Sequence, residues 1–200
     1  MKTVKLKDIC TTITDGSHYS PIGQEVGYPM FSVKDMGEYG FDYSDCKFIS
    51  EEDYTMLVKN GCKPLKNDIL IAKDGSYLKE IFVIKEERDE VILSSIAILR
   101  PDISVVNPYY LAYYLKSSHI KEIVASKYVT GSVLKRIILK NFENIEIDLP
   151  NKDIQDKIAK ILLNIDSQIE RNNAMVQKLL SFVYTICCIS HKKGELRYAC

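Results

Sequence analysis

The sequence lacks the features that most directly assign a chain to a functional class. Its 200 residues contain no tryptophan, and its six cysteines form neither a Cys-x-x-Cys pair nor a Cys/His spacing that would hold zinc. A structural metal is therefore not expected. We expect free thiols at Cys10, Cys46, Cys62, Cys187, Cys188 and Cys200.

Long apolar runs are also missing. The longest nearly apolar stretch, Phe182 to Ile189, is too short to span a bilayer, and the N-terminal stretch MKTVKLKDIC lacks the apolar segment of a secretory signal. Hydrophobic residues make up 46% of the chain and charged residues 27%, which is typical of a folded globular protein. These observations predict a cytoplasmic protein that makes no membrane contact.

The chain has no net charge, because 27 Lys and Arg residues balance 27 Asp and Glu residues. This argues against a uniformly basic nucleic-acid binder, but the charges are unevenly distributed. From Lys116 to Lys140 there are six cations and one acid, and from Glu38 to Asp53 there are six acids and one cation. The first run predicts either a basic face that binds a polyanion or an ordinary solvated surface.

No recognisable catalytic motif is present. The chain has no P-loop, its three histidines are scattered, and no glycine-rich turn follows a strand in the way that holds S-adenosylmethionine or a dinucleotide. We therefore expect no cofactor and no active site in this chain.

The stretch NPYYLAYYL at 107–115 allows two interpretations. Its Asn-Pro-aromatic start is similar to the catalytic loop of DNA adenine methyltransferases, although Tyr109 stands where that loop has a second proline. It is also typical of a helix start, because Asn107 can cap the first turn and Pro108 suits the first helical position. The missing cofactor motif favours the helix, and a stand-alone adenine methyltransferase is the alternative.

Residues 1–150 show the pattern of a mixed α/β (α+β) domain. Short segments rich in Ile, Val and aromatic residues are separated by turns, which is typical of strands. A segment at 50–61 begins with Ser50, continues with acids and reaches Gly61, which predicts a capped helix. We predict strands at 28–33, 68–73, 80–85 and 91–100.

From residue 151 the apolar spacing becomes that of a helix. No Pro or Gly interrupts 151–190, which predicts one helix roughly 60 Å long, followed by a tail at 191–200. Its apolar stripe is too long for a small domain to cover, so we expect a coiled-coil partner helix. The alternative is a helix folded back on its own domain. The positions expected to pair are Ile158, Ile161, Ile165, Ile169, Asn172, Val176 and Leu179.

Three turn-rich segments are candidates for DNA contact. TDGSHYSP (14–21) and KDGSYLKE (73–80) combine short hydrogen-bonding side chains with aromatic or charged ones, which suits contact with base edges and phosphates. YVTGSVLKRIILK (128–140) predicts either a helix N-terminus that binds a phosphate or an ordinary capped helix. The residues that we expect to contact DNA are Ser17, His18, Lys34, Lys73, Asp74, Ser76, Tyr77, Lys79, Lys127, Tyr128, Thr130, Gly131, Ser132, Lys135 and Arg136.

Taken in order, these segments resemble one known family. VKLKDICTTITDGSH, LKNDILIAKDGS, LSSIAILRPD, NPYYLAYYLKS, TGSVLKRI and IEIDLPNKDIQDKIAKILLNIDSQIERNN are similar to the target-recognition domain and following helix of specificity (S) subunits from Type I restriction–modification systems. The resemblance covers about residues 3–183, and its last segment is the most specific. The matching residues there are Leu149, Pro150, Gln155, Ile158, Ala159, Leu162, Asp166, Ile169 and Asn172.

The resemblance implies a non-catalytic subunit that binds double-stranded DNA and docks methyltransferase (M) subunits, which methylate adenine. It also implies a separate restriction (R) subunit. Family members usually carry two domain–helix units and this sequence carries one, so the resemblance implies a half-length subunit that pairs as a homodimer on a bipartite target. A truncated or rearranged gene and a coiled-coil adaptor with no role on DNA are the alternatives.

Overall fold

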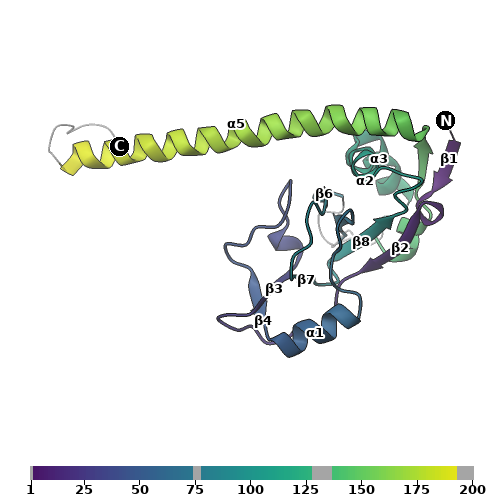
Figure 1. The fold of residues 1–200 in the computed structure, drawn as a ribbon, viewed down its shortest axis with the longest axis horizontal. Coiled ribbons are helices and arrows are strands. Elements are labelled where there is room, and N and C mark those ends of the chain that lie inside the picture. The colour runs from purple at the N-terminus through teal and green to yellow at the C-terminus, as the bar shows by residue number, and fades with distance from the viewer. Residues whose placement is uncertain (1, 74–77, 128–136, 193–200) are drawn as a thin grey trace. The chain divides into compact units, whose positions relative to one another are not determined.

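The computed structural model describes residues 2–73, 78–127 and 137–192, with side chains described up to Cys188. Contacts divide the chain into two compact units, Met1–Ala159 and Lys160–Cys200. All the described strands and shorter helices belong to the first unit, whereas the second consists of the greater part of one long helix (Figure 1).

The described strands of the first unit form three sheets. A four-stranded antiparallel sheet has the order β2-β8-β5-β6, a three-stranded sheet has the order β4-β3-β7, and β1 pairs with β9. Among the described strands, β3 and β7 are the one parallel pair. The predicted mixed α/β class is confirmed, with the strands distributed over three sheets. The strands are β1 Lys2–Lys5, β2 Cys10–Asp15, β3 Tyr28–Phe31, β4 Lys47–Ile49, β5 Ile69–Ala72, β6 Ile81–Val83, β7 Val91–Ile92, β8 Ile96–Pro101 and β9 Glu146–Leu149.

Side chains that alternate in direction along the central strands form a separate core on each face of the four-stranded sheet. On β5, Ile69 and Ile71 pack into one apolar cluster, whereas Leu70 and Ala72 pack into another. Helices cover the first cluster, and residues of the three-stranded sheet contribute to the second. Burial on both faces explains why these strands appear in the sequence as continuous apolar runs. The helices are α1 Glu51–Lys59, α2 Pro108–Lys116, α3 Ser118–Lys127, α4 Leu139–Glu143 and α5 Lys152–Lys192, with 3₁₀ turns at Leu6–Asp8 and Val33–Asp35.

Two predicted helix starts are confirmed by their caps. The Ser50 hydroxyl accepts a hydrogen bond from the Asp53 N–H at the start of α1. The Asn107 side-chain oxygen accepts from the N–H groups of Tyr109 at 2.9 Å and Tyr110 at 3.1 Å, and Pro108 is the first residue of α2. The helix interpretation of NPYYLAYYL is therefore correct.

The prediction of one strand at 91–100 is wrong, because Leu93 forms an isolated bridge with Ser17 and a turn at 94–95 then separates β7 from β8. In this turn the Ser94 N–H donates to the Ser17 carbonyl, and the Ser95 hydroxyl accepts from the Val33 N–H. The chain thereby crosses from the three-stranded to the four-stranded sheet. Contacts with residues far away in the sequence set this break, so local composition does not reveal it.

The long helix α5 is unbroken from Lys152 to Lys192, which confirms the helix predicted at 151–190. Its start is fixed by the buried Gln155, which has 1% of its surface exposed. The Gln155 amide donates to the carbonyls of Val105 and Pro150, and its oxygen accepts from the Asn107 N–H at 2.8 Å. Two residues of the family resemblance, Pro150 and Gln155, thus join the starts of α2 and α5.

The apolar stripe of α5 is uncovered. The six apolar positions predicted to pair are between 37% and 60% exposed, and Phe182 is 63% exposed. Such exposure fits a partner helix. None of the described helices is both long and apolar enough to cross a membrane.

Candidate nucleic-acid interface

The turn after β2 carries the first two residues that we expect to contact DNA. Gly16 lies so close to β7 that an added Cβ would be 2.1 Å from the Ile92 carbonyl oxygen, so only glycine fits. Ser17 is buried, and its hydroxyl both donates to the Tyr19 carbonyl and accepts from the Tyr19 N–H. The His18 side chain is 82% exposed. Ser17 therefore shapes the turn, and His18 is the member able to reach a ligand.

Lys73, which directly follows β5, is buried and pairs with Asp15, the last residue of β2. Its ammonium lies 2.5 Å from Asp15 Oδ2, and the His18 Nε2 atom lies 3.9 Å from the same oxygen. The Lys73 N–H donates to the Ser95 carbonyl, and its own carbonyl accepts from the Ile137 N–H at 3.2 Å. One residue therefore joins the end of β2, the end of β5 and the chain that precedes α4.

These contacts bring together residues from all three segments that the sequence predicts to contact DNA. Asp15 lies in the first segment, Lys73 begins the second, and Ile137 lies in the third. We name Asp15, Lys73 and Ile137 the loop base. Several of the predicted contact residues lie outside the described residues: Asp74, Ser76, Tyr77, Tyr128, Thr130, Gly131, Ser132, Lys135 and Arg136.

The other predicted lysines are at the surface. The Lys34 side chain is 64% exposed with its ammonium 3.7 Å from Asp35, and the Lys79 side chain is 69% exposed with its ammonium 3.5 Å from Glu80. Lys127 is exposed at the last residue of α3. Surface ion pairs of this kind are weak, so both paired ammonium groups remain able to approach a phosphate.

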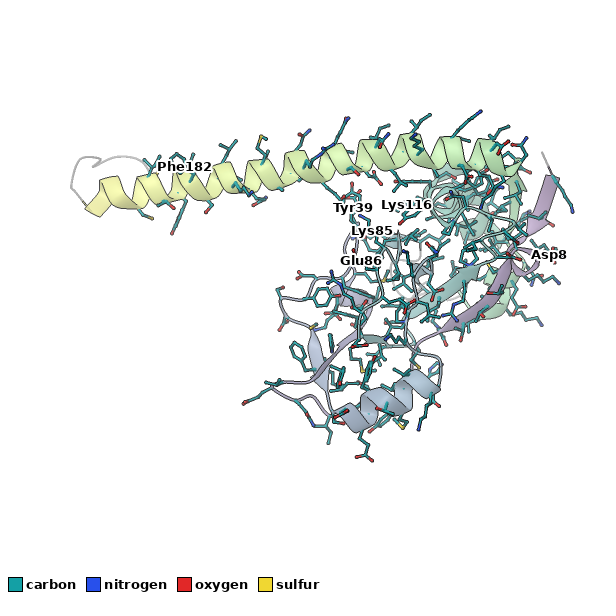
Figure 2. The ribbon with its side chains drawn as sticks, viewed as in Figure 1. Asp8, Tyr39, Lys85, Glu86, Lys116 and Phe182 are labelled. Carbon is teal, nitrogen blue, oxygen red and sulfur yellow. The ribbon has the colours of Figure 1, made fainter. Side chains whose placement is uncertain are left out.

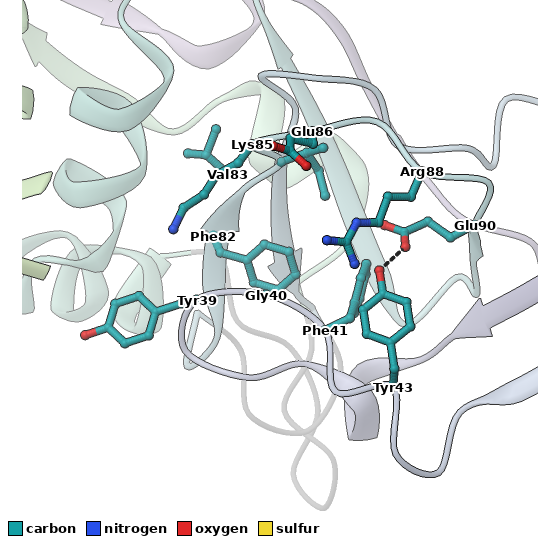
Figure 3. Close-up of a pocket in the computed structure, with 11 residues that line it drawn as sticks. Tyr39, Gly40, Phe41, Tyr43, Phe82, Val83, Lys85, Glu86, Arg88 and Glu90 are labelled. Atoms are coloured by element: carbon teal, nitrogen blue, oxygen red, sulfur yellow. Dashed lines mark hydrogen bonds between the residues drawn. The ribbon is translucent and has the colours of Figure 1, made fainter. Parts of the chain in front are cut away.

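An aromatic hollow of about 360 Å³, which no pattern in the sequence indicates, lies beside β6 (Figure 3). The Phe41 and Phe82 rings meet edge to face, and the Arg88 guanidinium lies 5.4 Å from the centre of the Tyr43 ring. The Tyr43 hydroxyl donates to the buried Glu90 carboxylate. These residues come from 39–43 and 82–90, and no spacing in the sequence connects the two stretches.

Burial controls the ionisation of the Tyr43–Glu90 pair. Desolvation, reinforced by the hydrogen bond to Glu90, raises the pKa of Tyr43 to about 12. Desolvation also raises the pKa of Glu90, opposed by the Tyr43 hydroxyl and the Arg88 charge. Among the described residues, no group of three or more His, Cys, Asp or Glu side chains is arranged to hold a metal ion.

Comparison with known proteins gives a consistent result. Residues 1–180 match the family model described as "Type I restriction modification DNA specificity domain". The chain is 32% identical over 152 residues to the Type I restriction enzyme MjaVIII specificity subunit of Methanocaldococcus jannaschii, which covers 76% of this chain and 32% of that protein. It is 26% identical over 182 residues to the putative MjaX specificity subunit of the same organism, covering 88% and 41%.

A solved structure shares the fold. The S subunit of a Type I restriction–modification system from M. genitalium superposes with a TM-score of 0.60 at 18% identity, over 85% of this chain and 40% of that one. The chain spans well under half the length of the two curated relatives and of this structure.

Proposed function

The chain belongs to the Type I restriction modification DNA specificity domain family, and from this premise we propose that it is the DNA-recognition subunit of a Type I restriction–modification complex. It binds a specific double-stranded sequence and directs partner adenine methyltransferase subunits, and a restriction subunit, to that sequence. In this proposal residues 1–150 recognise DNA, and the helix at 151–190 pairs with a second helix. The observation that carries the proposal is the loop base, where three polar segments distant in the sequence meet.

The loop base supports recognition because buried contacts hold it together, while the segments that it carries are polar in sequence. The Asp15–Lys73 ion pair is almost buried, and the backbone of Lys73 is hydrogen-bonded to Ser95 and Ile137. A fixed base places side chains such as His18 at defined distances from one another, as reading of base edges requires. Lys73 contributes as the residue that positions the loops, while exposed lysines such as Lys79 supply charge for phosphates.

The Asn107 contacts argue against the alternative of a methyltransferase in this chain. Its side-chain oxygen already accepts two hydrogen bonds from α2, and its amide donates to the Asp156 carboxylate at 2.7 Å. A catalytic asparagine must instead present these atoms to the target amine. The Asn107 side chain is engaged in holding α2 and α5 together, so the methyltransferase chemistry is assigned to a partner.

The uncovered stripe of α5 supports pairing with a second copy of the chain. Six predicted pairing positions are apolar and exposed, and Asn172 lies among them where a polar residue fixes register. Two identical recognition units related by a two-fold axis require a palindromic target made of two halves with a fixed gap. The proposed assembly is therefore a homodimer that also docks methyltransferase subunits.

Mapping methylated adenines tests the function and the assembly separately. Genomic DNA is sequenced from cells that carry this chain together with its neighbouring methyltransferase, and from cells in which this chain alone is deleted. We expect a palindromic bipartite motif that depends on the chain. An asymmetric bipartite motif would overturn the homodimer but not DNA recognition, and methylation independent of the chain would overturn both.

A further inference from the structure

A second hollow, of about 450 Å³, lies in the first unit and is lined by three lysines. Lys116 is the last residue of α2, Lys121 lies in α3, and Lys79 precedes β6. Glu38, Glu80 and Ile81 complete the lining. We call it the lysine hollow.

Two tyrosine rings fix the central cation of this hollow. The Lys116 ammonium lies 5.8 Å from the centre of the Tyr39 ring and 5.9 Å from that of Tyr113. Figure 2 shows Tyr39 and Lys116 next to each other, although they lie far apart in the sequence. Cation–π contacts hold an ammonium in place without neutralising its charge. Lys116 therefore presents an ordered positive charge, rather than one that swings freely in solvent.

The charges of the lysine hollow favour an anion, although its lining also includes carboxylates. Three ammonium groups face two carboxylates, and the Lys79 ammonium is 3.5 Å from Glu80. Glu38 is exposed at the rim and belongs to the acidic run of the sequence, while Lys116 and Lys121 belong to the basic run. Removing the charge of Glu38 should thus strengthen any anion binding here, and removing a lysine should weaken it.

The hollow is close in the sequence to two of the segments that we expect to contact DNA. Lys79 is separated from residues 74–77 by Leu78 alone, and α3, which carries Lys121, leads directly into residues 128–136. We therefore expect the backbone of a DNA duplex that contacts these segments to pass near the hollow. Its phosphates are the anions that proximity and charge favour.

We propose that the lysine hollow binds a backbone phosphate of the DNA held by the loop segments, with Lys116 and Lys121 as the main cations. The proposal rests on the DNA-recognition function proposed above. Lysine ammonium groups act on a phosphate as point charges with several donors, so the contact carries no sequence information. It fixes the position and rotation of the recognition unit on the duplex, while the loops read the bases.

The test measures the salt dependence of DNA binding by the full chain. Fluorescence anisotropy with a labelled random-sequence duplex is recorded over a series of NaCl concentrations, because non-specific binding is dominated by phosphate contacts. Lys116→Gln and Lys121→Gln should each weaken binding at low salt about threefold to tenfold and reduce the log–log salt slope by about 0.9 per phosphate contact. Glu38→Gln should strengthen binding.

Matched variants separate a phosphate contact from a general effect of charge or folding. Lys59→Gln removes an exposed lysine from α1, outside the hollow, and should leave the slope unchanged. Lys116→Arg keeps the charge and the ring contacts and should restore most of the slope. Thermal unfolding of each variant shows whether the fold is intact.

Two results would overturn the proposal, and they differ. If the wild-type chain binds DNA but the slope is the same in the wild type, Lys116→Gln and Lys121→Gln, the hollow is not a phosphate site although the DNA-recognition function stands. If the wild-type chain binds no duplex even at low salt, that function fails and the hollow's role fails with it.

Discussion

The two units of the chain differ in the exposure of their apolar side chains. In the unit Met1–Ala159, residues such as Leu99 and Leu111 are completely buried, whereas on α5 beyond Ala159 Leu179 is 56% exposed and Phe182 is 63% exposed. Every buried polar residue among the described side chains also lies in the first unit: Ser17, Asp35, Asp68, Lys73, Glu90 and Gln155. The first unit thus contains its own core, whereas the apolar side chains of the second are left exposed. Identical substitutions in the two units should therefore have different consequences.

The largest contrast is expected for leucine. Leu111→Ala removes a fully buried side chain from the helix-covered core and should lower the free energy of unfolding by about 2 to 5 kcal/mol. Leu179→Ala should leave the unfolding of the first unit unchanged and weaken self-association by about tenfold or more. Urea unfolding measures the first effect and sedimentation equilibrium the second. Equal losses of stability in both variants would contradict the comparison.

Loss of a buried charge should lower the free energy of unfolding almost as much as Leu111→Ala does. Lys73→Met leaves Asp15 without its cation in a nearly buried site, which should cost about 3 kcal/mol and release the loop base. Lys178→Met removes an exposed charge from α5 and should change the free energy of unfolding by less than about 0.5 kcal/mol. Urea unfolding compares the two variants. We also expect Lys73→Met to reduce discrimination between target and random DNA more than Lys178→Met does.

Local signals in the sequence predicted the elements that local contacts make. Ser50 and Asn107 cap helices through residues two or three positions away, and α5 lacks helix breakers, so their positions could be inferred. The break between β7 and β8 could not be inferred from the sequence, because it depends on contacts with Ser17 and Val33, which are distant in the sequence.

The candidate site divides in the same way. The composition of the turns indicated the three polar segments as candidates for DNA contact. Their meeting at Lys73 depends on pairing between strands, which composition does not reveal. The sequence also placed Lys73 among the residues expected to contact DNA. Its burial and its pairing with Asp15 are visible only in three dimensions. Likewise, no spacing relates Tyr39 to Lys116.

The buried amide of Gln155 offers a smaller contrast within one helix. Gln155→Leu leaves the Asn107 N–H and the carbonyls of Val105 and Pro150 without this partner, which should lower the free energy of unfolding by about 1 to 3 kcal/mol. Gln168→Leu changes an exposed residue of α5 that follows Ile165 by three positions and so lies on the same helix face. It should not destabilise the chain, because it adds apolar surface where the second helix is proposed to pack. If the two substitutions destabilise equally in urea, the anchoring role of Gln155 is wrong.

The smallest expected effect is a change in how stability depends on pH, at the one buried glutamate among the described residues. Because the pKa of Glu90 is raised on folding, the folded state holds its proton at pH values where the unfolded state has released it. The carboxylate therefore destabilises the fold increasingly as pH rises through the range between the unfolded and folded pKa values. The loss is complete above the folded pKa, so Glu90→Gln should raise the free energy of unfolding at neutral pH and bring little gain at strongly acidic pH. Tyr43→Phe removes the hydroxyl that stabilises the Glu90 charge and should steepen the loss. Urea unfolding across a pH series measures both variants, and a gain from Glu90→Gln that is the same at every pH would show that shape, rather than ionisation, governs this site.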